Sequence, residues 1–102
     1  MVAVPYLHDV RVFDGNGIHV IGHVVAVDES GLHILSDEAF EGSGEHHFML
    51  DDLASFDPGK KAQFSATCDY CDPDDEILDL YHVHLRFTHL SRRASEVAQL
   101  LV

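Results

Sequence analysis

Apolar and polar residues alternate with a period of two through much of this chain, most clearly in "YHVHLRF", residues 81–87. Successive side chains of a β-strand point to opposite faces, so this pattern predicts a strand with one apolar and one polar face. The apolar face, which we expect in a core, carries Tyr81, Val83, Leu85 and Phe87. The polar face, which we expect toward solvent or a partner, carries His82, His84 and Arg86.

Other segments with strand-like patterns are separated by turn signals at short, regular intervals. The Asn16-Gly17 pair suits a tight hairpin turn, because such turns need positive φ angles that glycine and asparagine tolerate. Gly22 lies inside an apolar run and indicates a bulge or a bend of a barrel. Further turns are predicted at residues 41–45, 56–59 and 72–76. Strands are predicted around residues 10–12 and at 18–27, 32–36, 46–50, 61–71 and 77–87.

The C-terminal segment changes to helical spacing. Ser91 is a natural N-cap for a helix over about residues 91–101. Its apolar stripe comprises Leu90, Ala94, Val97, Ala98 and Leu101. Short strands followed by one helix predict an all-β fold, a small antiparallel β-barrel of about six strands with a C-terminal α-helix. The 102 residues contain no linker, so we expect a single domain over residues 1–102, with its strands over about 10–87.

The net charge of −12 limits the classes of partner. Nucleic acids and anionic membranes need clustered cations, and this chain has eighteen acidic residues against six lysines and arginines. A cation or a basic protein surface is the expected partner class; the alternative is that the acidity only maintains solubility. No apolar run approaches the roughly 18 residues of a membrane span. The N-terminus lacks the pattern of a secretory signal, so we expect a cytoplasmic protein with no membrane insertion.

Two stretches of the chain stand out together: "GHVVAVDESGLHIL", residues 22–35, and "YHVHLRFTHLSRRASEVAQLL", residues 81–101. Their layout resembles the PilZ domain family, and the resemblance covers essentially the whole chain. Asp28 and Ser30 match the start of the family's Asp-x-Ser-x-x-Gly motif, and Arg86-Phe87 matches the end of its last strand. The resemblance implies a small bacterial barrel that responds to cyclic di-GMP and controls motility, pili or surface polysaccharide.

The chain departs from that family where the nucleotide would be bound. Family members hold the phosphates with an Arg-x-x-x-Arg segment before the first strand, because guanidinium groups bind phosphate bidentately and stack on bases. This sequence has no arginine before Arg11 and no two arginines four residues apart. Gly31 follows Ser30 directly, so we interpret residues 28–31 as a hairpin turn with Gly31 at its left-handed end. Losing two charge-assisted contacts of about 1.5–3 kcal/mol each would weaken nucleotide binding by orders of magnitude.

These observations predict a non-enzymatic regulatory or adaptor domain that acts through protein contacts and has a degraded cyclic di-GMP site. One alternative is a cyclic di-GMP receptor that uses non-standard ligands, namely Asp28, Ser30, Gly31, Arg86 and the helix arginines Arg92 and Arg93. Arg92 and Arg93 lie in the first helical turn, where the helix dipole disfavours cations. They either pair with acidic residues or form, with Arg86, a basic spot for a partner or an anion.

A second alternative is a metal-binding module. His82 and His84 share one strand face, a spacing that can place two imidazoles on one metal. Cys68 and Cys71 form a single CxxC motif, but in a regular strand their thiols point to opposite faces. We therefore expect one buried and one edge thiol, both reduced, and no resident cofactor. The sequence shows no Ser-His-Asp order and no glycine-rich phosphate loop, so no enzymatic activity is expected.

Overall fold

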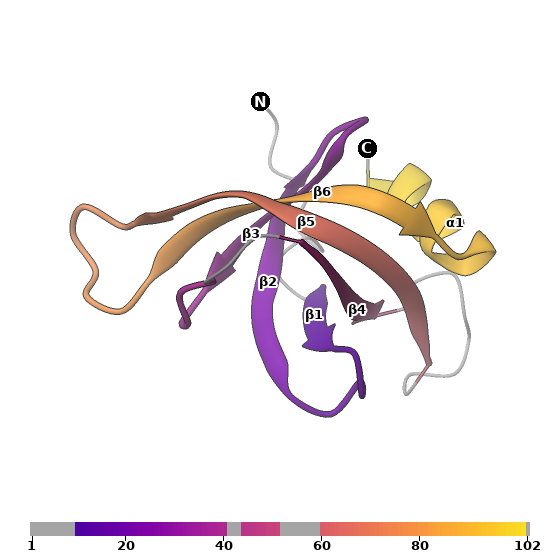
Figure 1. Ribbon diagram of the computed structural model, residues 1–102, viewed down its shortest axis with the longest axis horizontal. Coiled ribbons are helices and arrows are strands. Elements are labelled where there is room, and N and C mark those ends of the chain that lie inside the picture. Colours follow the sequence, from indigo (N-terminus) through magenta and orange to yellow (C-terminus); the bar gives the residue numbers. More distant parts are fainter. Residues whose placement is uncertain (1–9, 41–43, 52–59, 102) are drawn as a thin grey trace.

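The computed structural model describes residues 10–40, 44–51 and 60–101. This part of the chain forms six strands and one helix (Figure 1). The elements are β1 (Arg11–Asp14), β2 (Val20–Val27), β3 (Gly31–Ser36), β4 (Glu45–Asp51), β5 (Lys61–Pro73), β6 (Tyr81–Leu90) and α1 (Arg92–Leu101). The strands close into a barrel in the order β1-β2-β3-β6-β5-β4, and every neighbouring pair is antiparallel. The predicted all-β barrel with a C-terminal helix is confirmed.

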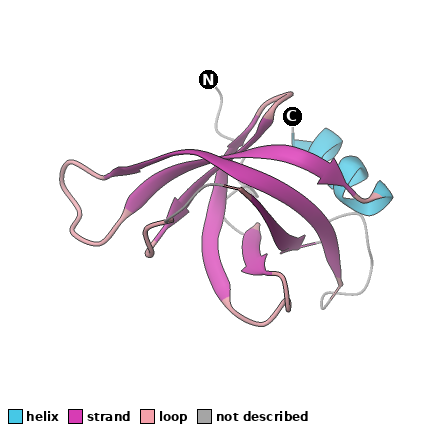
Figure 2. Cartoon of the chain, in the orientation of Figure 1, coloured by secondary structure: helices cyan, strands magenta, loops and turns pink. Residues whose placement is uncertain are grey.

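Alternating side chains of the strands fill the barrel. Its largest fully buried residues include Leu32 and Ile34 of β3, Leu50 of β4 and Leu85 of β6. Helix α1 lies beside the barrel, as Figure 2 shows, and contacts β5, β6 and β2. Its contribution to the core is a buried pair, Ala94 and Val97. Burial of this apolar area, worth about 25 cal/mol per Å², is the main force that closes the sheet.

The start of α1 follows the predicted chemistry. The Ser91 hydroxyl accepts a hydrogen bond from the Ala94 backbone N–H at 3.1 Å, which confirms Ser91 as the N-cap. Leu90 belongs to β6 and not to the helix, so its place in the apolar stripe was wrong. Strand pairing of Leu90 with Phe64 outweighs its helical spacing. The side chain of Leu101 lies outside the described part of the structure.

The β5–β6 connection differs from the prediction. β5 runs on to Pro73 and β6 begins at Tyr81, so residues 77–80 form part of the turn and not the start of a strand. The carboxylate of Asp74 causes this, since it accepts hydrogen bonds from the backbone N–H groups of Glu76 and Ile77. Those bonds fold the backbone back on itself, and the apolar segment that follows is left without a partner strand.

Other predicted turns are placed as follows. The β1–β2 turn has positive φ at Gly17 but not at Asn16. A register shift in the β1–β2 pairing occurs next to Gly22, which confirms the predicted irregularity there. Part of the predicted turn at residues 41–45, and all of that at 56–59, lie outside the described residues.

A polar cluster on the outer face of the barrel as candidate functional site

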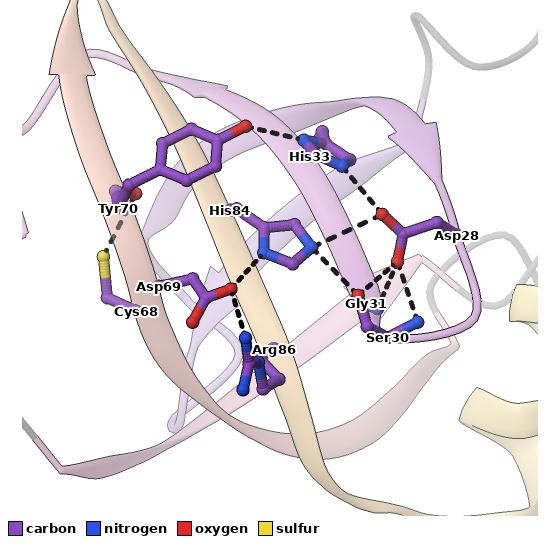
Figure 3. Close-up of polar contacts among 9 residues, drawn as sticks. All are labelled: Asp28, Ser30, Gly31, His33, Cys68, Asp69, Tyr70, His84 and Arg86. Atoms are coloured by element: carbon purple, nitrogen blue, oxygen red, sulfur yellow. Dashed lines mark hydrogen bonds and ion pairs between the residues drawn. The ribbon is translucent and has the colours of Figure 1, made fainter.

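Three aromatic rings lie side by side on the outside of the barrel, one from each of three neighbouring strands. His33 of β3 and Tyr70 of β5 are both register partners of His84 on β6. The ring centroids of His33 and His84 are 4.3 Å apart, and those of Tyr70 and His84 are 5.7 Å apart. Figure 3 shows the three rings with their polar neighbours. Cross-strand pairing therefore fixes the position of the central imidazole from both sides.

A β-bulge adds a carboxylate to this face. The pairing of β5 with β6 shifts between Cys68 and Tyr70, so Asp69 is an extra residue in β5. A bulge turns two consecutive side chains toward one face, and here Asp69 joins Tyr70 on the outside. Asp69 Oδ2 lies 3.0 Å from His84 Nδ1 and accepts a hydrogen bond from Arg86 Nη2 at 2.9 Å. These two contacts, the imidazole first, lower the pKa of Asp69.

The β2–β3 turn supplies a second carboxylate. Asp28 Oδ1 accepts hydrogen bonds from the Ser30 hydroxyl at 2.6 Å and from the backbone N–H groups of Ser30 and Gly31, both at 2.8 Å. Its other oxygen, Oδ2, lies 2.8 Å from His33 Nε2 and 3.5 Å from His84 Nε2. The pKa of Asp28 is held well below its ordinary range, mainly by the Ser30 hydroxyl. The predicted hairpin turn is thus confirmed, and its Asp side chain faces both histidines.

Gly31 is needed in this turn for a different reason from the one predicted. Positive φ among the described glycines occurs at Gly17 and Gly44, so Gly31 is not left-handed. A Cβ on Gly31 would instead overlap the carbonyl oxygen of Leu85 and lie 2.8 Å from its carbonyl carbon. Phe87 also donates its backbone N–H to the Ser30 carbonyl at 2.9 Å. Gly31 therefore allows the turn to lie directly against β6, which brings Asp28 to His84.

His84 is buried, with only 5% of its surface exposed, although we expected it to face solvent or a partner together with His82. The face was predicted correctly, but His33, Tyr70 and two carboxylates cover that part of it. His82 remains exposed and has a separate partner, because its Nε2 lies 2.7 Å from Asp74 Oδ1. That contact, together with two backbone N–H groups, lowers the pKa of Asp74 to about 2. The predicted metal pair of His82 and His84 is thus not the combination that the structure brings together.

In space, His84 lies between Ser30 and Asp69, as the histidine of a Ser-His-Asp triad would. The amino-acid sequence showed no sign of this arrangement. The Ser30 hydroxyl oxygen is 3.5 Å from His84 Nε2, and His84 Nδ1 is 3.0 Å from Asp69. The hydroxyl donates its proton to Asp28 at 2.6 Å, which is a much shorter contact than the one to the imidazole. A serine nucleophile needs its proton directed to the histidine, so this hydroxyl is not activated.

The arginines of the predicted basic spot are each paired with a carboxylate. Arg86 binds Asp69. Arg92 Nε lies 3.6 Å from Glu96, and Arg93 Nη1 donates to the same carboxylate at 2.9 Å. Pairing with acidic residues is therefore the arrangement seen, and it reduces the positive potential that a bound anion would meet.

The two cysteines lie on the core side of β5 and take no part in the cluster. Cys68 pairs with Leu85 and Cys71 with Val83, both of which point inward. The bulge at Asp69 shifts the alternation by one residue, so both thiols face the same way and both are half-buried. The expectation of one buried and one edge thiol was wrong for this reason. Burial raises the pKa of the Cys68 thiol and keeps it protonated.

Comparisons with known proteins found no matching family model, no matching curated protein and no matching solved structure. The resemblance to PilZ domains therefore stays a prediction from residues 22–35 and 81–101. Within the described residues, no helix has the length and apolar character required to cross a membrane.

Proposed function

We propose that this chain is a non-enzymatic, PilZ-like regulatory domain of the bacterial cytoplasm that acts by binding another protein. The observation that carries this proposal is the tip of the β5–β6 hairpin. Ile77 and Leu78 are 58% and 89% exposed there, at adjacent positions. Figure 1 shows this hairpin extending from the barrel, away from α1. Two neighbouring exposed aliphatic side chains on a projecting turn provide an anchor of the kind that fills a pocket on a partner.

Hydrogen bonds of Asp74 restrain the backbone of the tip. Asp74 accepts two backbone hydrogen bonds within the turn, contacts His82, and donates its own N–H to the Leu80 carbonyl at 2.7 Å. An ordered loop loses little conformational entropy when it binds, so more of the contact energy appears as affinity. The anchor is flanked by the acidic residues Asp74, Asp75, Glu76 and Asp79. We therefore expect the partner to present an apolar groove bordered by lysine or arginine side chains.

The nucleotide alternative has less support. Arg86, the arginine that matches the family's last strand, is engaged with Asp69. Asp28 and Ser30 bind each other, and both carboxylates of the cluster are held in their ionised form. A dianionic ligand would have to displace these contacts and approach two negative charges. Each charge-assisted contact that is lost costs about 1.5–3 kcal/mol, which makes protein binding the better-supported function.

The proposal is tested with the double variant Ile77→Ser/Leu78→Ser. A protein captured from the source cell and crosslinked through a photoreactive leucine analogue in place of Leu78 is identified, purified and titrated against the wild type and the double variant. Anchor side chains contribute more than about 1 kcal/mol each, so we expect the double variant to bind about 30-fold more weakly or worse. The affinity should also fall as salt is raised, because the tip is acidic.

The matched control is Ile18→Ser, which removes another exposed isoleucine, 83% exposed, from the β1–β2 turn. We expect this variant to bind as the wild type does. Equal affinity of the wild type and the double variant for the purified partner would contradict the proposal.

A further inference from the structure

We propose that Asp28, His33 and His84 form a binding site for a divalent transition metal ion, with Zn²⁺ as the ion that it fits best. Each residue offers one ligand atom, and the three atoms lie within 4.8 Å of one another. In the described segments 10–40, 44–51 and 60–101, no other three histidine, cysteine or acidic side chains come together in this way. The site is independent of the hairpin tip and adds a ligand to the function proposed above.

The distances are close to those of a coordination shell. Zn²⁺ binds imidazole nitrogen and carboxylate oxygen at about 2.0–2.2 Å, so two ligands of a tetrahedral ion lie about 3.4 Å apart. His84 Nε2 is 3.5 Å from Asp28 Oδ2, and His33 Nε2 is 2.8 Å from the same oxygen. The second separation has to widen, and the third, between the two imidazole ligand atoms, is within 4.8 Å. The side chains of Asp28 and His33 are 45% and 34% exposed, so they have room to make this adjustment.

The orientation of the rings supports a metal more strongly than the distances do. A histidine that ligates a metal through one ring nitrogen usually donates the N–H of the other to a carboxylate or a similar acceptor. Asp69 Oδ2 lies 3.0 Å from His84 Nδ1 and already accepts a hydrogen bond from Arg86, so this contact places the ring proton of His84 on Nδ1. In the neutral ring, the lone pair is then on Nε2, which faces Asp28 in Figure 3 and lies 3.5 Å from its Oδ2.

His33 has a matching outer partner. Its Nδ1 lies 3.0 Å from the Tyr70 hydroxyl, whose oxygen can accept a hydrogen bond from Nδ1–H when Nε2 is a ligand. Both imidazoles therefore have the arrangement expected of metal ligands, with Nε2 inward and Nδ1 bound to a residue on β5. His82 differs from them: its described side-chain contact is the one from Nε2 to Asp74, and none is described for its Nδ1.

Charge and donor type indicate the class of metal. Asp28 and Asp69 carry two negative charges and Arg86 one positive charge, so the cluster attracts a cation, as does the chain with its net charge of −12. Two nitrogen donors favour zinc and its neighbours over Mg²⁺ and Ca²⁺, which take oxygen ligands. Three protein ligands on the barrel surface leave a fourth position for water, an open arrangement that structural zinc sites lack.

The test is a Zn²⁺ titration of protein prepared without a histidine tag, in competition with a chromophoric chelator. We expect one ion per chain. Asp69→Asn should weaken binding about 10- to 100-fold, the usual effect of removing an outer partner of a metal-bound histidine. His33→Gln should weaken it more, because it removes a ligand. His33 is partly exposed, so this variant keeps the test valid even if a substitution of the buried His84 unfolds the protein.

The control is His82→Gln, which removes a histidine with a carboxylate partner outside the three-residue group and should leave the affinity unchanged. Long-range nitrogen–proton NMR spectra should show Zn²⁺ perturbing Nε2 of His33 and His84 while Nδ1 of His84 keeps its proton. Absence of stoichiometric binding would overturn the proposal. Equal weakening by His33→Gln and His82→Gln would also overturn it, because binding would then be an unspecific property of surface histidines.

Discussion

Replacing Gly31 by alanine is the substitution with the most clearly defined structural consequence in this barrel. The new Cβ would overlap the Leu85 carbonyl oxygen and lie 2.8 Å from its carbonyl carbon and 3.0 Å from the Arg86 Cα. All three are backbone atoms of the neighbouring strand, so no side chain can rotate to relieve the overlap. β3 and β6 would have to separate at the point where the β2–β3 turn positions Asp28.

The magnitude follows from two contributions. Overpacking costs about 1–3 kcal/mol, and weakening the adjacent hydrogen bond from Phe87 N–H to the Ser30 carbonyl costs about 0.5–1.5 kcal/mol. We therefore expect Gly31→Ala to lower the free energy of unfolding by about 3 kcal/mol. For a domain of this size, that corresponds to a fall in Tm of roughly 12–24 °C. Urea denaturation followed by circular dichroism measures the first quantity and a thermal scan the second.

Two other glycines give a graded control series. A Cβ would lie 2.6 Å from the Leu35 carbonyl oxygen at Gly22, and 3.2 Å from the His47 carbonyl oxygen at Gly15. The loss of stability should therefore decrease in the order Gly31→Ala, Gly22→Ala, Gly15→Ala, and the last should stay within about 1 kcal/mol of the wild type.

Asparagine at position 31 separates the two explanations of this glycine. A left-handed position tolerates asparagine better than alanine, whereas a close backbone contact excludes every side chain that has a Cβ. We expect Gly31→Asn to be no more stable than Gly31→Ala. An asparagine variant clearly more stable than the alanine variant, or an alanine variant within 0.5 kcal/mol (about the effect of a neutral surface change) of the wild type, would refute the close-contact explanation.

Three further predictions concern the core, the helix and pH. Leu85→Ala should lower the free energy of unfolding by about 2–5 kcal/mol in urea denaturation, because Leu85 is fully buried, whereas Leu78→Ala should change it by no more than about 0.5 kcal/mol. Ser91→Ala should cost about 0.5–2 kcal/mol through loss of the N-cap, with Ser95→Ala, inside the helix, as a control that does not reproduce this loss. The lowered pKa of Asp74 means that its ionised form stabilises the fold above the unfolded pKa near 3.8, and that this stabilisation is lost as pH falls toward 2. Asp74→Asn should therefore be less stable than the wild type near pH 6, and the two melting curves should converge between about pH 4 and pH 2.

The sequence was informative wherever a local rule acts alone. Alternation in residues 81–87 assigned the faces of β6 correctly, and the buried Val83 and Leu85 confirm it. The N-cap at Ser91 and the hairpin at residues 28–31 were also predictable, because short side chains at those positions bond to the nearby backbone.

The candidate site was predictable only in part, because it depends on register. The sequence indicated Asp28, Ser30, Arg86 and His84, but not His33, Asp69 and Tyr70, which join them. The period of a strand gives the face of His84 but not the residues that cover it, and these come from the β2–β3 turn and from β3 and β5. The bulge at Asp69 adds one residue to β5 and reverses the faces of all that follows, including Cys71. No glycine or proline in residues 67–71 indicates a bulge at that position. A cluster whose residues come from separate strands can therefore be recognised only when the register of those strands is known.

The central claim is that the β2–β3 turn and Arg86 do not bind the nucleotide. Its most direct test is a calorimetric titration with cyclic di-GMP. It is performed on tag-free protein in a buffer that contains a chelator, so that any metal at the histidines is removed. The expected result is no saturable binding, because Arg86 is paired with Asp69 and two ionised carboxylates flank the turn. A micromolar dissociation constant that is lost in Arg86→Ala would contradict it and would make the chain a cyclic di-GMP receptor with non-standard ligands.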